Sequence, residues 1–150
     1  MINTKNANTF TGTQGAEALE SLSKNLAKNI TLREAQKKGG TSQVIKPNEI
    51  LFASTGVIGE HLDADKVIRS IKSMSPFKSP DWIKAATAIK TTDTFTKVSK
   101  RICKIDDAEI EIVGIAKGSG MIAPNMSTML GFIFTNANIS SDTLQKLIVS

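Results

Sequence analysis

KGSGMIAPNMSTMLGF, residues 117–132, is the stretch that decides the fold. Its glycines, proline and asparagine predict an irregular loop, and this loop leads directly into an apolar segment that begins at Thr128. A hydroxyl residue at a loop-to-strand junction, behind a small residue and within reach of a lysine, can serve as a nucleophile. We therefore predict that the chain cuts its own peptide bond between Ser127 and Thr128. Thr128 would then be a new N-terminal residue that carries nucleophile and base together.

Strands are expected on both sides of this loop. Residues 108–112, AEIEI, alternate as a half-buried strand does, and Asp106-Asp107 is typical of a turn that joins it to a strand at 95–104. A further strand is predicted over 128–135. A final helix is expected to begin near Ser141-Asp142 and to direct three apolar side chains inward: Leu144, Leu147 and Ile148.

The N-terminal half predicts alternating helices and strands, and therefore the α/β class. A polar loop over residues 3–12 precedes a helix at 14–30, with an apolar face at helical spacing. Residues 31–43 are expected to be an exposed connection, with room for a short extra helical turn. Residues 50–54 are typical of a short buried strand, and 55–59 of a tight turn. Asp63 or Asp65 can cap the next helix, and Ser79-Pro80-Asp81 begins another that is expected to run to about Lys90. The chain begins in a loop and ends after a helix, so we expect a single partial domain.

The composition excludes several classes of protein. The chain has 150 residues, of which 40% are apolar and 22% charged, so it is expected to be globular. No apolar run approaches a membrane span, and the polar N-terminus has no export signal. With one cysteine, Cys103, and one histidine, no internal disulfide or tetrahedral zinc site is expected, and a cytoplasmic location is predicted. The net charge of +5 is spread over scattered lysines with one Trp and no Tyr, which argues against nucleic-acid binding.

Three motifs resemble the ornithine acetyltransferase family of arginine biosynthesis, also called the bifunctional glutamate N-acetyltransferase. They are Asn6-Ala7-Asn8 with Thr11-Gly12, the run ASTGVIGE at 53–60, and GIAK at 114–117 followed by NMSTML at 125–130. Thr91-Thr92-Asp93-Thr94 fits between them in the family's order. The sequence departs from the family where Thr4-Lys5 replace a Ser-Gly pair and where Ser127 replaces an alanine. The resemblance covers essentially the whole chain, although the family's proteins are longer at both ends.

The resemblance implies a partial αββα-type sandwich of stacked sheets between helices, like that of self-processing N-terminal-threonine hydrolases. Residues 1–127 would belong to the α chain and 128–150 would begin the β chain, in an α2β2 heterotetramer with the remaining portions of the precursor. It further implies a ping-pong transfer of an acetyl group from N-acetylornithine to glutamate through an acetyl-threonine, without a metal or organic cofactor. Some members of the family also accept acetyl-CoA as the donor. Family residues that close the substrate site lie beyond Ser150, so this piece alone is expected to be inactive.

The same resemblance assigns the other site residues. Thr55 and Gly56 match the family's oxyanion hole, where a hydroxyl and a backbone N–H can stabilise the developing negative charge. Lys117 matches a lysine that binds the substrate carboxylate, and Thr92 or its neighbour Thr91 matches a substrate-contacting threonine, with Thr92 preferred. Without the motifs, these residues would be an ordinary turn, a solvated lysine and a helix cap, and Thr128 an ordinary start of a strand.

Two further functions stay open from the sequence. One is a related self-cleaving aminopeptidase, and the other is a truncated, non-catalytic binding module that keeps the motifs without maturing. His61 is interpreted as a surface or packing residue, because the threonine amine supplies the base. Cys103 is interpreted as a small buried hydrophobic residue.

Overall fold

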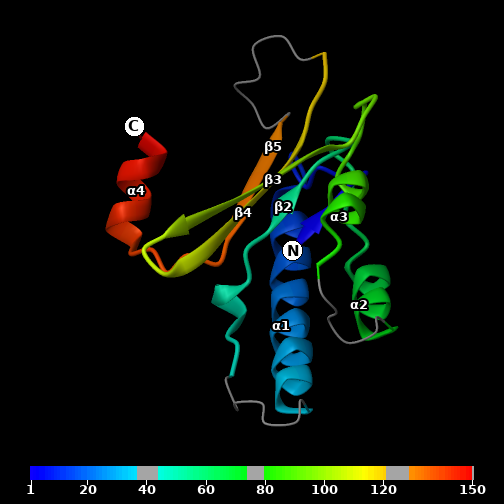
Figure 1. Ribbon diagram of the computed structural model, residues 1–150. Helices are drawn as coiled ribbons and strands as arrows, with labels where there is room; N and C mark the ends of the chain where they lie inside the picture. The colour runs from blue at the N-terminus through cyan, green and yellow to red at the C-terminus, as the bar shows by residue number, and fades with distance from the viewer. Residues whose placement is uncertain (37–43, 74–79, 121–128, 150) are drawn as a thin grey trace.

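The computed structural model describes residues 1–36, 44–73, 80–120 and 129–149. Within these ranges the fold is α/β, as predicted. A parallel sheet joins β1 (Ile2–Asn3) to β2 (Ala53–Ser54), and an antiparallel sheet has the order β3-β4-β5. Its strands are β3 (Lys97–Ile105), β4 (Ala108–Lys117) and β5 (Leu130–Thr135). The helices are α1 (Gly12–Gln36), the short 3-10 helix η1 (Pro47–Glu49), α2 (Ala64–Ser73), α3 (Trp82–Ala88) and α4 (Ser141–Val149) (Figure 1).

The long helix α1 organises the N-terminal half. Its predicted apolar face is buried at Leu22 and Leu26, and α2 packs beside it with Ile68 buried. The helix continues to Gln36, so the predicted helix end at residue 30 is too early. Residues 31–36, where an extra helical turn was allowed for within the connection, are part of α1. Leu, Arg, Glu, Ala and Gln dominate this segment and are good helix formers, which explains the extension.

The antiparallel sheet buries one face against α3. Val113 and Ile115 of β4 pack with Ala86 and Ile89 at the end of α3, and together they form the core of this half. The predicted turn at Asp106-Asp107 is confirmed, and Asp106 has a left-handed φ of 52°. Because side chains alternate along a strand, Ile112 lies on the other face, where it is 40% exposed. The buried face of β4 is therefore the one that carries Val113 and Ile115.

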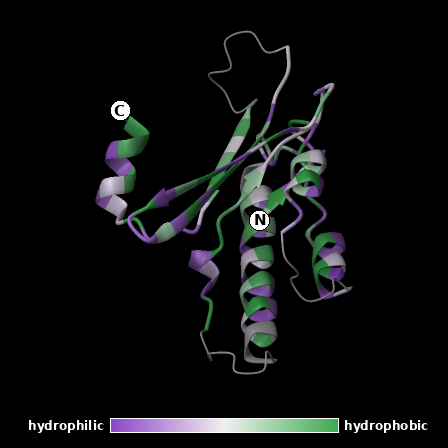
Figure 2. Cartoon of the chain, viewed as in Figure 1, coloured by the Kyte–Doolittle hydropathy of each residue, from purple (hydrophilic) through white to green (hydrophobic). Residues whose placement is uncertain are grey.

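Several expectations about burial are wrong. Residues 50–54 are not a buried strand, because only Ala53–Ser54 pair with the N-terminus and Leu51 is 81% exposed. Cys103 is exposed, because its partner in the register is Ile110 on the sheet face opposite α3. The apolar residues of α4 do not point inward: Leu144, Leu147 and Ile148 are 45%, 62% and 72% exposed. Figure 2 shows α4 at one side of the molecule, with hydrophobic residues among hydrophilic ones.

The helix starts follow the predicted capping chemistry. Asp63 accepts the Lys66 N–H at 2.8 Å, and Asp81 accepts the Lys84 N–H at 2.9 Å. Asp81 is itself the N-cap of α3, so Pro80 lies one residue before the cap. Helix α3 ends at Ala88, two residues before the predicted end.

Candidate active site

A cavity of about 1320 Å³ brings together predicted site residues from distant parts of the chain. Its walls come from the N-terminal segment, the bend after β2, the end of α3, the last residue of β4 and the start of β5. Thr55, Gly56, Thr91, Thr92 and Lys117 all line it. The structure therefore groups the predicted oxyanion-hole residues with the predicted substrate-binding residues.

The wall that contains Thr55 and Gly56 is built by backbone hydrogen bonds. The N-terminal segment lies along the bend, and the two exchange N–H and C=O groups in four successive bonds of 2.9–3.1 Å. These bonds run from Thr55 to Asn3, from Val57 to Lys5, from Ala7 to Val57 and from Gly59 to Thr9. The bend is thus held in place by residues 3–9.

Gly56 is required by this packing as well as by its own conformation. Its φ is +137°, and a Cβ added there would lie 2.2 Å from the Lys5 carbonyl carbon. Glycine, which lacks a Cβ, also lets a substrate approach the backbone N–H closely. The structure adds that the neighbouring backbone leaves no room for a side chain. Beside it, the Thr55 side chain is almost fully buried and makes no hydrogen bond within the described residues.

The asparagines of the first motif shape the segment that holds this wall. The Asn6 side chain donates to the Glu60 carbonyl and accepts the Asn8 N–H at 3.0 Å. Asn8 has a left-handed φ of 40°, and its own side chain accepts the Thr11 hydroxyl at 3.2 Å. Asparagine tolerates this conformation better than most residues. Sequence reasoning identified the motif but assigned these residues no role.

Lys117 forms part of the opposite wall and is buried. Strand alternation places it on the face of Val113 and Ile115, and it is only 3% exposed. Its ammonium donates to the Thr91 hydroxyl at 3.3 Å, and no ion pair of Lys117 is present in the described part of the chain. Thr91 therefore contacts Lys117, while the preferred Thr92 lines the same cavity. Burial of an ammonium is costly unless it is paired, so an anionic ligand in the cavity would stabilise it.

Asp93 supports this second wall, and sequence reasoning missed it. Its carboxylate is fully buried, forms an ion pair with Lys97 and accepts the Gly118 N–H at 2.8 Å. The hydrogen bond from Lys97, with further bonds from the Gly118 and Thr91 N–H groups, lowers the pKa of Asp93 to about 2 against the effect of burial. An acidic residue four positions before a lysine, in a run of threonines, was the available signal.

The predicted nucleophile lies outside the described residues, as does Ser127. Met129 and Leu130, which follow Thr128 in the sequence, line the cavity. His61 is exposed and is not among the lining residues. Among the described residues, no group of three or more His, Cys, Asp and Glu side chains could hold a metal ion, and no helix is long and apolar enough to cross a membrane.

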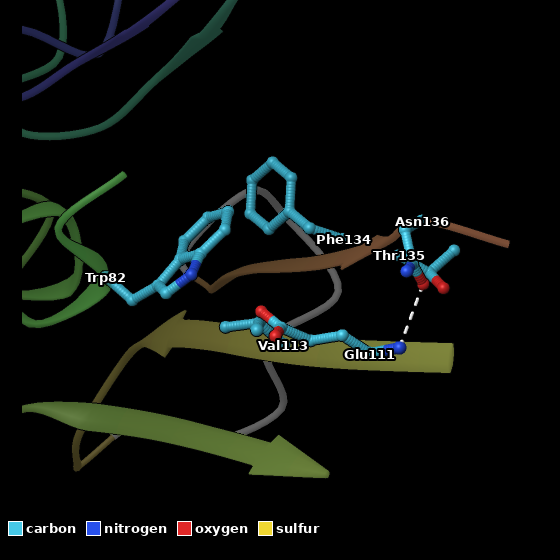
Figure 3. A pocket seen from close by; sticks show the side chains of 6 residues that line it. All are labelled: Trp82, Glu111, Val113, Phe134, Thr135 and Asn136. Carbon is cyan, nitrogen blue, oxygen red and sulfur yellow. Dashed lines mark hydrogen bonds between the residues drawn. The ribbon is translucent and has the colours of Figure 1, made fainter. Parts of the chain in front are cut away.

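A second cavity, of about 400 Å³, contains none of the predicted site residues. Figure 3 shows Trp82 directed toward Phe134, with ring centroids 4.7 Å apart, above Val113. At the other end, the Asn136 side chain accepts the Glu111 N–H at 2.8 Å and donates to the Glu109 carbonyl at 3.1 Å. Asn136 thus continues the pairing of β4 and β5 beyond Thr135, which is a structural role.

Comparison with known proteins identifies the family. The ArgJ family model matches residues 1–150, and the chain belongs to this family. The "Arginine biosynthesis bifunctional protein ArgJ" of Nitrobacter winogradskyi is 45% identical over 151 residues, covering 100% of this chain and 33% of that protein. The protein of the same name from Rhizobium meliloti is 43% identical, covering 99% and 33%. The chain therefore spans about a third of the length of these relatives.

A solved structure supports the same assignment. The crystal structure of the arginine biosynthesis bifunctional protein ArgJ from Bacillus halodurans matches with a TM-score of 0.66 at 28% identity. The match covers 86% of this chain and 60% of that one. The likeness confirms the fold class predicted from the sequence.

Proposed function

We propose that this chain contains the self-cleavage junction of an acetyltransferase, and that the whole protein moves an acetyl group from N-acetylornithine to glutamate. The family relatives are named as bifunctional proteins of arginine biosynthesis, which supports this reaction class. The observation that carries the proposal is the grouping of Thr55, Gly56 and Lys117 around one cavity. Met129, the residue after the proposed nucleophile, lines the same cavity.

Maturation would proceed by an acyl shift at Thr128. Its hydroxyl oxygen attacks the carbonyl carbon of Ser127, the peptide C–N bond breaks, and the acyl group passes from nitrogen to oxygen. Water then hydrolyses the ester, which releases the Ser127 carboxylate and restores the threonine hydroxyl. The new α-amine has an ordinary pKa of about 7.7–8.0, so a useful fraction is neutral near pH 7 and can accept the hydroxyl proton.

Acetyl transfer would use the two walls of the cavity in different ways. Thr55 and the Gly56 N–H stabilise the oxyanion as Thr128 attacks the acetyl carbonyl, while Lys117 and Thr92 or Thr91 hold the substrate. The amide C–N bond breaks, and ornithine leaves with the proton taken from the hydroxyl. The amine of glutamate then attacks the acetyl ester, the ester C–O bond breaks, and N-acetylglutamate leaves while the amine's proton restores the threonine hydroxyl. The reaction uses no metal or organic cofactor, and acetyl-CoA is a possible second donor. The partners are the remaining portions of the precursor in an α2β2 cytoplasmic enzyme.

Maturation is tested with the full-length precursor by intact-mass measurement and by acetyl exchange between N-acetylornithine and glutamate. The wild type is expected to break between Ser127 and Thr128 and to catalyse exchange. Thr128→Ala should abolish both, whereas Ser127→Ala should retain both and serves as the matched control. An uncut wild-type chain that still exchanges acetyl at a normal rate would refute the mechanism. Release of amines from short peptide amides, without exchange, would indicate an aminopeptidase, and neither activity would indicate a non-catalytic module.

A further inference from the structure

We propose that Asp93 is a positioning residue, which holds Lys117 and the adjoining Gly118 in place for self-cleavage and substrate binding. This inference rests on the function proposed above, because it assigns Asp93 to the same site. The carboxylate does not line the cavity, so it would act through the residues that it holds.

Asp93 lies where it can hold two strands at once, at the start of β3 and just after the end of β4. Lys97 begins β3 and pairs in register with Ala116, the residue before Lys117. Asp93 therefore lies where β3 begins and β4 ends, and it forms an ion pair with Lys97 while accepting the Gly118 N–H at 2.8 Å. Gly118 has a φ of 138° and is the first residue after β4. Gly118 begins the segment that leads to the scissile bond, and its N–H is thus hydrogen-bonded to a buried carboxylate.

A second set of contacts connects Asp93 to the Lys117 ammonium. The other carboxylate oxygen lies 3.5 Å from the Thr91 nitrogen, a long contact, and the Thr91 hydroxyl accepts from the Lys117 ammonium at 3.3 Å. Asp93 therefore contacts the backbone on both sides of the Lys117 ammonium: the Gly118 N–H next to Lys117, and the N–H of Thr91, whose hydroxyl accepts from that ammonium. Misplacement of a binding group by about 1 Å can reduce a rate by about 10²-fold.

The ion pair with Lys97 also keeps Asp93 from neutralising the positive charge of Lys117, which lines the cavity. Asp93 is fully buried, and Lys97 is 30% exposed and supplies its counter-charge. The negative charge of Asp93 is thereby matched, and Lys117 is left to attract the carboxylate of a substrate. Removal of Lys97 would leave Asp93 to compete with the substrate for Lys117.

The test uses Asp93→Ala, Asp93→Asn and Lys97→Met in the full-length precursor. We measure the rate of self-cleavage by intact mass and, on the cleaved fraction, KM and kcat for acetyl exchange. Asp93→Asn keeps the size of the side chain and an acceptor for Gly118, so it keeps the test valid even if Asp93→Ala fails to fold. Asp81→Asn is the matched control, because Asp81 also accepts a backbone N–H and pairs with a lysine, but it is half-exposed and lies at the start of α3.

Asp93→Asn is expected to slow self-cleavage and to raise the KM for N-acetylornithine, each by about tenfold, with a smaller change in kcat. Asp93→Ala should have the larger effect and Lys97→Met a smaller one in the same direction, while Asp81→Asn matches the wild type. Wild-type cleavage and KM in the folded Asp93→Asn and Lys97→Met proteins, with only a lower melting temperature, would show a purely structural role and overturn the inference. Failure of the wild type itself to cleave or exchange would instead refute the proposed function.

Discussion

The two walls of the cavity are held together by different forces. Around Thr55 and Gly56, successive backbone hydrogen bonds join the bend to the N-terminal segment, and no charged side chain takes part in them. Around Lys117, the contacts come from side chains, with the ion pair of Asp93 and Lys97 at their centre. One wall depends on the path of the backbone, and the other depends on the arrangement of charges.

This difference fits the two tasks proposed for the walls. An oxyanion hole must present donors at fixed positions, and a backbone ladder fixes them without side-chain freedom. A binding group for a carboxylate must keep its charge inside the protein, which requires neighbouring polar groups to hold it. We therefore expect the first wall to be sensitive to added volume and the second wall to be sensitive to changes of charge.

The largest effect on stability is expected from Gly56→Ala. The new Cβ would meet the Lys5 carbonyl carbon at 2.2 Å, at a φ of +137° that L-residues rarely adopt. Steric overlap and backbone strain together should lower the free energy of unfolding of the full-length protein by about 3–5 kcal/mol. Denaturant unfolding measures this loss as a lower midpoint concentration with an unchanged slope (m-value).

Gly59→Ala is the matched control for that substitution. Gly59 also has a positive φ, +81°, but no atom of the described residues, its chain neighbours aside, lies within 4 Å of its added Cβ. Only the backbone strain remains there, so the free energy of unfolding is expected to fall by about 1–2 kcal/mol. Equal losses for the two variants would show that contact with the N-terminal segment does not constrain the bend.

A smaller and oppositely directed effect is expected at Lys117. Lys117→Met keeps the long side chain but removes a buried ammonium that has no ion pair within the described residues, so stability should stay equal or rise. Loss of a charge-assisted hydrogen bond to the substrate carboxylate should raise the KM for N-acetylornithine by about 10–100-fold. Steady-state kinetics and thermal unfolding of the same preparation measure both changes.

Lys100→Met provides the comparison for this variant. Lys100 is half-exposed on the neighbouring strand and pairs with Glu111, so its loss should leave KM unchanged. An unchanged KM in Lys117→Met, or a large loss of stability, would show that Lys117 has a structural role and does not bind substrate.

Much of the second wall could be predicted from the sequence, because its signals are local. The alternating strand at 108–112 lies within β4, and Thr91 and Thr92 of the hydroxyl-rich run line the cavity. The burial of Lys117 follows from the same alternation that buries Val113 and Ile115. The local sequence could not show which face of β4 is buried, because that depends on where α3 packs.

The first wall could be recognised but not constructed from the sequence. Its ladder joins residues about 50 positions apart, so no periodicity in either segment reveals it. The apolar run at 50–54 was misinterpreted for this reason, because only the two residues that meet β1 form a strand. The exposed apolar face of α4 and the exposure of Cys103 likewise depend on packing that local pattern does not determine.

The smallest effect, and the one that best separates the two walls, is expected in acid. The pKa of Asp93 is lowered from 3.8 to about 2, so its folded-state interactions stabilise the protein above about pH 4 and are lost as the pH falls toward 2. Among the described residues, the charged side chain that interacts with this carboxyl is Lys97 of β3. The free energy of unfolding of the wild type should therefore fall more steeply than that of Asp93→Asn between about pH 5 and 2. This range includes the ordinary pKa of an aspartate, about 3.9. Denaturant midpoints of the wild type and Asp93→Asn, measured across this range, test the difference. Parallel acid curves for the wild type and Asp93→Asn would mean that the second wall, like the first, does not depend on this charge.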